Sequence, residues 1–172
     1  AVQEVAVRSR YDSHRVIEEF MITANVAAAE ILNNGKAICM YRIHDQPPLD
    51  KLESLRAYLK ELGYKLSRNR RLTPQHFQQI LEKVKDSEHE EAVATVILRA
   101  QAQAEYSPEN IGHFGLNLER YAHFTSPIRR YADLLVHRSL IHHLHLGNES
   151  SFEQHKQIFT KIGTEISETE RR

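Results

Sequence analysis

The chain has 172 residues, and its 23 Lys and Arg balance 23 Asp and Glu, so the formal net charge is zero. A hydrophobic share of 41% and a charged share of 27% are typical of a folded domain and argue against intrinsic disorder. The single cysteine, Cys39, excludes an intrachain disulfide framework, and no apolar run approaches the roughly 20 residues that span a bilayer. The neutral total also gives no direct support to a nucleic-acid partner.

The first half of the chain is predicted to be mainly helical. A helix is expected from Asp12, as its N-cap, to about Asn34, followed by a short strand over 37–43. Leucines at helical spacing predict a second helix over 49–62, and Thr73-Pro74 is typical of the start of a third.

The second half is predicted to contain three more helices and an irregular stretch. Ser87 and Glu90 form a potential capping box for a helix that reaches about Ala104. Residues 105–125 contain Pro, Asn and two Gly and then alternating apolar residues, which favours a loop followed by a strand. Ser126-Pro127 is expected to begin a helix that ends near Leu146, and a last helix is expected from near Ser151. The fold class is therefore α+β, predominantly helical with a few short strands.

Both ends of the chain look like cut points in a longer sequence. The chain opens directly on a β-like run, AVQEVAVR, and closes on a charged, helical SETERR. We expect residues 1–172 to be one part of a single domain, with no separate domain inside it. Exposed cut surfaces would then favour self-association of the isolated chain.

The neutral total conceals one basic segment. Residues 120–145 carry four arginines against one aspartate, a local net charge of +3, together with five of the eleven histidines. If Ser126 caps a helix, its free N–H groups lie beside Arg129 and Arg130 and form an anion site that suits a phosphate. The alternative is that both arginines are ordinary surface residues and that Asp133 neutralises one of them.

Two further groups of residues indicate contacts with a nucleotide. Glu18 and Asn25 are seven residues apart on one face of the first helix, where a carboxylate and an amide could hold sugar hydroxyls. An exposed polar stripe on an amphipathic helix is the alternative. Phe114 or Tyr121 could stack on a base, although a place in the core is the stronger interpretation for Phe114.

The histidine cluster over 137–145 does not indicate a metal site. His137, His142, His143 and His145 are 5, 1 and 2 residues apart, so no pair has the i, i+4 spacing of a helical zinc site. The five aspartates are scattered, which gives no group for two-metal chemistry. We expect no metal ligands in this chain.

Several motifs resemble one known family. The segments HRVIEEFMITANVAAAE, YRIHDQPP, GHFGLNLERYAHFTSPIRRYADLLVHRSL and SETERR, in this order, resemble the C-terminal half of the catalytic RNB domain of ribonuclease II/R exoribonucleases, with the ribonuclease R branch closest. The resemblance runs from about Ser13 to the end and is most specific over 113–138. Ala132 stands where many relatives have Pro.

The resemblance implies a processive, magnesium-dependent 3′→5′ exoribonuclease that hydrolyses single-stranded RNA to nucleoside 5′-monophosphates. The aspartates that bind magnesium would lie before this chain, so the isolated chain is expected to be inactive. The intact enzyme would be cytoplasmic and monomeric, with no membrane contact and no small-molecule cofactor. A non-catalytic RNA-binding or adaptor module is the alternative function.

The resemblance also implies residue roles. Arg129 matches the arginine of the family that contacts the scissile phosphate and is the expected catalytic residue. Glu18 or Glu19 matches a glutamate that holds the ribose, and Glu18 is preferred because it shares a face with Asn25. The full set of expected substrate-binding residues is Glu18, Glu19, Asn25, Tyr121, His123, Thr125, Ser126 and Arg130.

Overall fold

The computed structural model describes residues 11–67, 72–147 and 155–171. Its elements are α1 (Asp12–Asn34), β1 (Tyr41–Ile43), α2 (Leu49–Glu61), α3 (Pro74–Val84), α4 (Glu90–Ala100), β2 (Glu105–Ser107), the 3₁₀ turn η1 (Phe114–Leu116), α5 (Tyr131–His143) and α6 (Lys156–Glu170). The described residues are mostly helical with two short strands, which confirms the predicted fold class.

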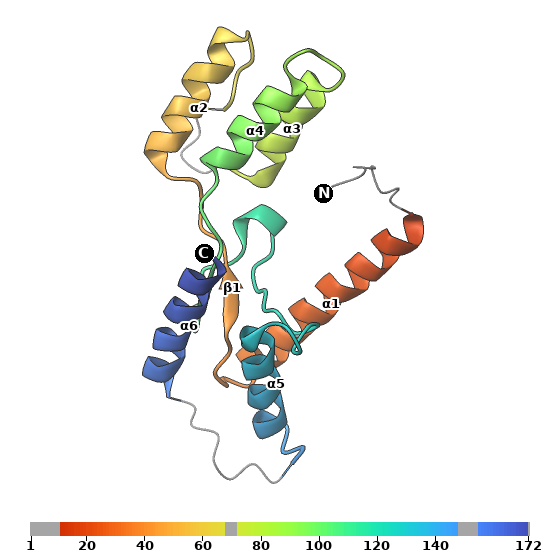
Figure 1. Ribbon diagram of the computed structural model, residues 1–172, viewed down its shortest axis with the longest axis vertical. Coiled ribbons are helices and arrows are strands. Elements are labelled where there is room, and N and C mark those ends of the chain that lie inside the picture. Colours follow the sequence, from red (N-terminus) through yellow and green to blue (C-terminus); the bar gives the residue numbers. More distant parts are fainter. Residues whose placement is uncertain (1–10, 68–71, 148–154, 172) are drawn as a thin grey trace, which may run out of the picture.

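Two short antiparallel strands connect the two parts of the molecule. Tyr41 of β1 lies opposite Ser107 of β2, so the chain leaves this ribbon after β1 and returns to it after α4. The helices α2, α3 and α4 lie between the two strands in sequence and form a separate helical group at one end of the molecule (Figure 1).

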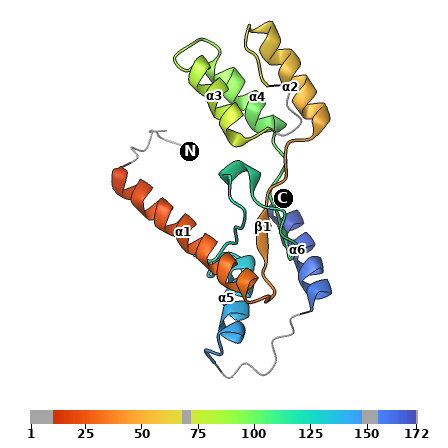
Figure 2. The same ribbon diagram turned by 180° about the vertical axis from the view of Figure 1, so that it is seen from behind.

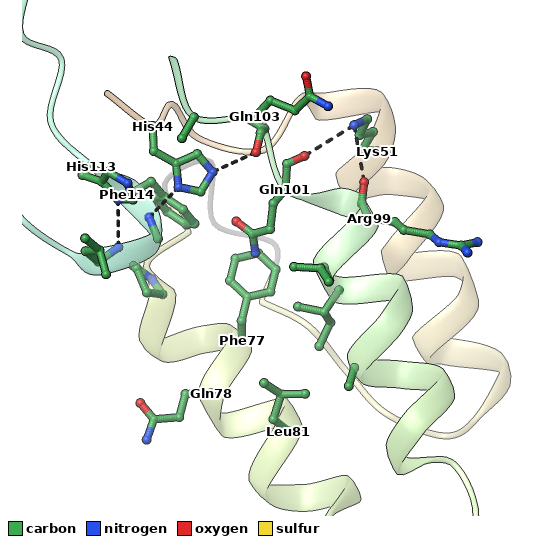
Figure 3. Close-up of a pocket in the computed structure, with 18 residues that line it drawn as sticks. His44, Lys51, Phe77, Gln78, Leu81, Arg99, Gln101, Gln103, His113 and Phe114 are labelled. Carbon is green, nitrogen blue, oxygen red and sulfur yellow. Dashed lines mark hydrogen bonds between the residues drawn. The ribbon is translucent and has the colours of Figure 1, made fainter. Parts of the chain in front are cut away.

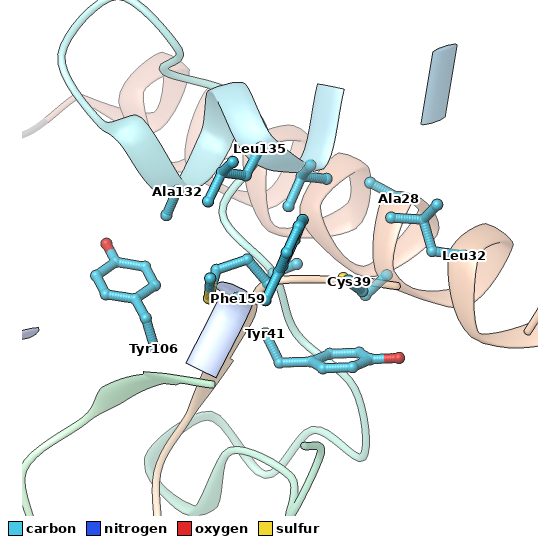
Figure 4. Close-up of a cluster of buried hydrophobic side chains, with 12 residues drawn as sticks. Ala28, Leu32, Cys39, Tyr41, Tyr106, Ala132, Leu135 and Phe159 are labelled. Atoms are coloured by element: carbon cyan, nitrogen blue, oxygen red, sulfur yellow. The ribbon is translucent and has the colours of Figure 1, made fainter. Parts of the chain in front are cut away.

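The helices on the ribbon enclose the first hydrophobic core. Helix α6 lies on one side of β1, while α1 and α5 lie on the other (Figures 1 and 2). Phe159 of α6, Leu32 of α1 and Leu135 of α5 are almost fully buried, and they belong to one cluster with Cys39, which precedes β1 (Figure 4). Burial of each such side chain stabilises the fold by about 1.5–3 kcal/mol. This core fixes α1 and α5 relative to each other.

The inserted helices form a second core of their own. Leu52, Leu55 and Leu59 of α2 are buried, as the leucine spacing predicted, and they pack with apolar residues of α3 and α4. Thr73 caps α3 and Pro74 is its first residue, again as predicted. Phe114 of η1 packs against this core, so η1 links it to the rest of the molecule.

Several predicted boundaries were wrong. Asp12 is the first residue of α1 and not its N-cap, because Tyr11 occupies that position and its N–H donates to His14 Nδ1. Ser87 and Glu90 form no capping box: the Ser87 hydroxyl donates to the Val84 carbonyl. His89 is instead the N-cap of α4.

The irregular stretch also differs from its prediction. Pairing in the first strand begins only at Tyr41 rather than 37. Helix α4 ends at Ala100 rather than Ala104, because the chain must turn there to enter β2. Over 105–125 a loop followed by a strand was expected, but the strand comes first, as β2, and Leu116 of the expected strand lies in η1. The predicted start of the last helix at Ser151 lies outside the described residues.

Close approach of α6 to β2 depends on Gly163. A Cβ atom at this position would lie 2.5 Å from the backbone oxygen of Tyr106. Ser167 also joins α6 to β2, because its hydroxyl accepts a hydrogen bond from the Tyr106 N–H and donates one to the Gly163 carbonyl. Only glycine therefore allows the helix to reach the strand.

We predict that Gly163→Ala destabilises the chain. The added methyl group overlaps a backbone atom that cannot easily move, so overpacking should lower the free energy of unfolding by about 1–3 kcal/mol. Urea unfolding followed by circular dichroism measures this change. Gly147→Ala is the matched control, because its Cβ would meet only the Ile141 side chain at 3.4 Å. Equal stability of the two variants would contradict the proposed contact.

Candidate functional site

The segment 121–130, between η1 and α5, is held against α1 by one buried amide. Asn25 is 3% exposed, and its Nδ2 donates to the Tyr121 hydroxyl at 2.9 Å. Its Oδ1 accepts hydrogen bonds from the backbone N–H groups of Phe124 at 2.8 Å and Thr125 at 3.2 Å. Asn25 thus fixes both the side chain at the start of the segment and the backbone in its middle.

Helix α5 holds the other side of the same segment. The His137 ring stacks on Phe124 with centroids 4.2 Å apart, and its Nε2 is 2.8 Å from the Phe124 carbonyl oxygen. Asp133 is fully buried, and its Oδ1 accepts the Ser126 N–H at 2.7 Å. The backbone before the two arginines is therefore fixed from two helices.

Asp133 also binds Arg130. The Arg130 Nε donates to Asp133 Oδ2 at 2.7 Å, and its Nη2 donates to Oδ1 at 2.9 Å. Such a bidentate pair is among the stronger charge-assisted contacts in proteins. The alternative noted from the sequence, neutralisation of one arginine by Asp133, therefore holds for Arg130.

The predicted start of α5 was wrong. The helix begins at Tyr131 with Arg130 as its N-cap, whereas Ser126 and Pro127 precede it. The Ser126 carbonyl accepts the N–H groups of Arg129 and Arg130, which closes a separate turn. Since Asp133 takes the Ser126 N–H, the expected helix N-terminus with free N–H groups beside Ser126 does not exist.

Arg129 lies within this turn and remains exposed. Its backbone is fixed by the bond to Ser126, yet its guanidinium makes no hydrogen bond or ion pair with any described residue. The neighbouring Ile128 is fully exposed. A cavity of about 420 Å³ next to the turn is lined by Arg129, Arg130, Tyr131 and residues of β2 and α6, including Glu165 and Glu170. The turn thus presents a charged side chain on a fixed backbone.

Histidine and tyrosine rings from the start of this segment and from the chain before it form a row of ring contacts. The Tyr121 ring meets His113 and His123 edge to face at 5.4 and 5.6 Å, and the Tyr106 hydroxyl is 2.8 Å from His123 Nδ1. Burial, together with unfavourable electrostatic interactions with His44 and Arg42, lowers the pKa of His113 to about 4. Burial and the nearby Arg130 lower the pKa of His123 to about 4 as well.

Burial raises the pKa of Tyr106. Its hydroxyl therefore stays protonated, and it lies within hydrogen-bond distance of Nδ1 of the neutral His123 ring. Tyr121 is itself buried at 8% exposure, with other rings against its face. The row is thus part of the internal support of the segment, and stacking of an external base on Tyr121 is not what this geometry favours.

The expected sugar-binding pair is not assembled in the structure. Glu18 and Glu19 are exposed on the N-terminal half of α1, whereas Asn25 is buried and uses its amide inside the protein. Seven residues along a helix correspond to about 10 Å of its axis. The described structure therefore gives the glutamates and Asn25 different surroundings.

His44 has a structural role that its sequence context did not predict. Its Nδ1 accepts the Gly115 N–H at 2.9 Å, so its Nε2 carries the proton toward the Ala102 carbonyl at 2.9 Å. These bonds join three chain segments that run between the two cores: the residue after β1, η1 and the residues after α4. His44 also lines a cavity of about 1090 Å³ whose walls include Phe77, Gln78 and Phe114 (Figure 3). Only its position directly after a strand could have drawn attention to it.

Among the described residues, no group of three or more His, Cys, Asp or Glu side chains is placed to hold a metal ion. Within the same residues, no helix combines the length and apolar character needed to cross a membrane.

The chain belongs to the RNB domain family, whose pattern matches residues 1–146. Within that family, its curated relatives include ribonuclease R of Aquifex aeolicus, which is 46% identical over 162 residues, and ribonuclease R of Escherichia coli, which is 39% identical over 179. These alignments cover 94% and 99% of this chain but 23% and 22% of the relatives. The chain thus spans about a quarter of their length, and the resemblance seen in the motifs is confirmed.

Solved structures show the same fold. Mycoplasma genitalium RNase R in complex with ribose methylated single-stranded RNA superposes with a TM-score of 0.85 at 34% identity, covering 95% of this chain and 26% of that one. The same enzyme in complex with double-stranded RNA also has a TM-score of 0.85 at 34% identity, covering 94% of this chain and 29% of that one. Yeast Ssd1, a pseudonuclease, has a TM-score of 0.72 at 27% identity, covering 89% of this chain and 19% of that one.

We predict that the two buried histidines make the fold sensitive to mild acid. An unfolded histidine has a pKa of about 6.5, whereas His113 and His123 have pKa values of about 4 when folded. The unfolded state therefore binds more protons between these values. The free energy of unfolding should fall as the pH drops from about 6.5 to 4, by at most about 1.4 kcal/mol per pH unit for each histidine.

Urea unfolding at a series of pH values measures this slope. His113→Asn and His123→Asn should each flatten it, since asparagine keeps an acceptor near Nδ1 but does not titrate. His145→Asn, at an exposed position, is the control and should leave the slope unchanged. An unchanged slope in both buried-site variants would rule out the two histidines as its source.

Proposed function

We propose that the whole protein is a processive 3′→5′ exoribonuclease that releases nucleoside 5′-monophosphates, and that this chain supplies its phosphate-contacting arginine, Arg129. The observation that carries the proposal is the turn 126–130, whose backbone is fixed from buried groups while the Arg129 guanidinium stays exposed. A positioned cation of this kind stabilises charge that develops on phosphoryl oxygens in the transition state. The family membership and the RNA-bound structural neighbours support it.

The geometry distinguishes the two neighbouring arginines. Arg130 directs its guanidinium into Asp133, which is fully buried, and is largely neutralised there. Arg129 has no such partner among the described residues. Because a guanidinium offers several N–H donors in a planar fork, Arg129 can bind two oxygens of one phosphate. We therefore assign the phosphate contact to Arg129.

The ribose contact is proposed for Glu18 or Glu19. Both are exposed on α1, the helix whose buried Asn25 anchors the segment 121–130, so their backbone is held relative to Arg129. A carboxylate can accept hydrogen bonds from ribose hydroxyls, and contact with the 2′-hydroxyl would select RNA. Ser126, Thr125 and Asn25 are proposed to shape this site.

Magnesium is expected in the whole enzyme, but the described residues do not fit it. Magnesium prefers carboxylate oxygens and water, and no cluster of such side chains occurs among the residues that the structure describes. We therefore assign no step of the reaction to a metal held by this chain. The ligands are proposed to lie in the larger part of the protein that the curated relatives have and this chain does not span.

The partner proposed for the whole protein is single-stranded RNA, with the chain forming the C-terminal half of one RNB domain. We propose that the enzyme acts as a monomer in the cytoplasm, where its substrate is, and needs no small-molecule cofactor. These statements concern the intact protein, of which the chain represents about a quarter by comparison with its relatives.

A second candidate function is RNA binding without catalysis. It is favoured by the similarity to yeast Ssd1, a pseudonuclease. The two functions differ in the aspartates expected outside this chain: an intact group supports the nuclease, and a degenerate group supports the binding protein. Assay of the full-length protein on a labelled oligonucleotide with magnesium separates them directly.

We predict that Arg129→Ala in the full-length protein lowers kcat by about 10²–10³, because one charge that stabilises the transition state is lost. RNA affinity should change far less, since many other contacts hold the strand. Single-turnover degradation of a labelled poly(A) oligomer and anisotropy titration measure the two quantities. Unchanged turnover would refute the assignment of Arg129.

Arg138→Ala is the matched control for this experiment. Arg138 is an exposed arginine of α5, about two turns from the start of the helix, so its loss removes the same net charge from the same helical region. It should leave kcat near the wild-type value. A similar loss in both variants would indicate a general electrostatic effect rather than a positioned contact.

The isolated 172-residue chain is predicted to show no magnesium-dependent nuclease activity. It lacks a described carboxylate cluster that could bind the metal, while the proposed arginine is present. The same poly(A) assay with added magnesium provides the measurement. Shortening of the oligomer by the purified chain would show that the chain contains its own metal site.

A further inference from the structure

We propose that Asp133 and Arg130 form a positioning pair for Arg129, so that Arg130 acts as an internal brace rather than as an RNA contact. The inference rests on the proposed function of Arg129. Asp133 accepts three hydrogen bonds, from the Ser126 N–H and from two nitrogens of Arg130. Ser126 begins the turn and Arg130 ends it. The carboxylate thus fixes both ends of the turn that carries Arg129.

The path from Asp133 to Arg129 runs through the backbone of the turn. The Ser126 carbonyl accepts the N–H of Arg129 at 3.3 Å and that of Arg130 at 3.2 Å. Among the described residues, the Asp133 carboxylate bonds to Ser126 and Arg130 and makes no hydrogen bond or ion pair with Arg129. A change at Asp133 would therefore loosen the Arg129 backbone without touching its guanidinium.

The pair also separates the charges of the two arginines. Two adjacent guanidinium groups could each compete for the same phosphate. The buried carboxylate withdraws Arg130 from this competition, since the Arg130 side chain is 21% exposed and that of Asp133 is 0% exposed. Arg129 remains the cation that the turn offers to solvent.

General stability is a weak explanation for this pair. Burying two charges carries a large desolvation penalty, and replacing a buried ion pair with apolar residues is often neutral or stabilising. The contact between α1 and α5 already has an apolar basis in residues such as Leu32, Leu135 and Val136. The preceding backbone is held separately by Asn25 and His137. What Asp133 and Arg130 add is the geometry of the turn itself.

The test uses the full-length protein with Asp133→Asn, Arg129→Ala and the double variant. Asparagine keeps an oxygen for the Ser126 N–H but cannot accept both Arg130 nitrogens. Asp133→Asn should lower kcat at least tenfold and change KM less than twofold. In the Arg129→Ala background it should have no further effect on kcat, because it acts through Arg129.

A second readout is the salt dependence of RNA binding, which reports the number of phosphate contacts. Arg129→Ala should reduce the slope of log affinity against log salt, whereas Asp133→Asn should not reduce it, because loss of the carboxylate charge releases Arg130 to bind phosphate. Leu135→Ala is the control: it weakens the same helix from its apolar side and should change neither kcat nor the slope in protein that remains folded.

The outcomes separate this inference from the function on which it rests. An inactive wild type, or an unaffected Arg129→Ala variant, overturns the proposed function and with it the inference. Activity that depends on Arg129 but not on Asp133, or additive effects of the two substitutions, overturns the inference alone. If Asp133→Asn does not fold, Arg130→Lys is judged by the same criteria, because it keeps the charge and loses the bidentate geometry.

Discussion

The buried side chains of Asn25 and Asp133 hold the segment 121–130 between α1 and α5, and the proposed site depends on this arrangement. Displacement of either side chain is unfavourable, because a buried amide or carboxylate that loses its hydrogen-bond partners keeps its full desolvation penalty. In each, the Oδ1 atom accepts hydrogen bonds from backbone N–H groups of the segment. A stretch without regular secondary structure thereby acquires a defined backbone path.

The helices can hold the segment because the first core fixes them. Helices α1 and α5 pack through apolar residues, while α6 closes against the opposite side of the strand pair at Gly163. The polar contacts of the segment therefore join surfaces that are already rigid. This separation of tasks, with apolar packing for the scaffold and buried polar groups for the loop, is how an irregular segment can present one exposed arginine in a fixed place.

The inserted helices are stabilised in a different way. Helices α2, α3 and α4 share their own core and meet the rest of the molecule through the strand connections and η1. His44 joins these connections with hydrogen bonds to Gly115 and Ala102. The His44 ring also meets His113, and the ring contacts continue through Tyr121 and His123 to Tyr106.

Local sequence was sufficient for most of the helices, for the family and for the position of the basic segment. Apolar spacing, Pro74 and the short-range motifs around SPIRR are properties of neighbouring residues, so they can be recognised without tertiary contacts. Tertiary structure alone decided which arginine is paired, where α5 begins and what Asn25 does. Asn25 donates a hydrogen bond to Tyr121, which is 96 residues away in the sequence. The Ser126 N–H donates to the Asp133 carboxylate, which becomes buried only when α5 packs. Such competition between partners depends on burial, and burial is not a local property of the sequence.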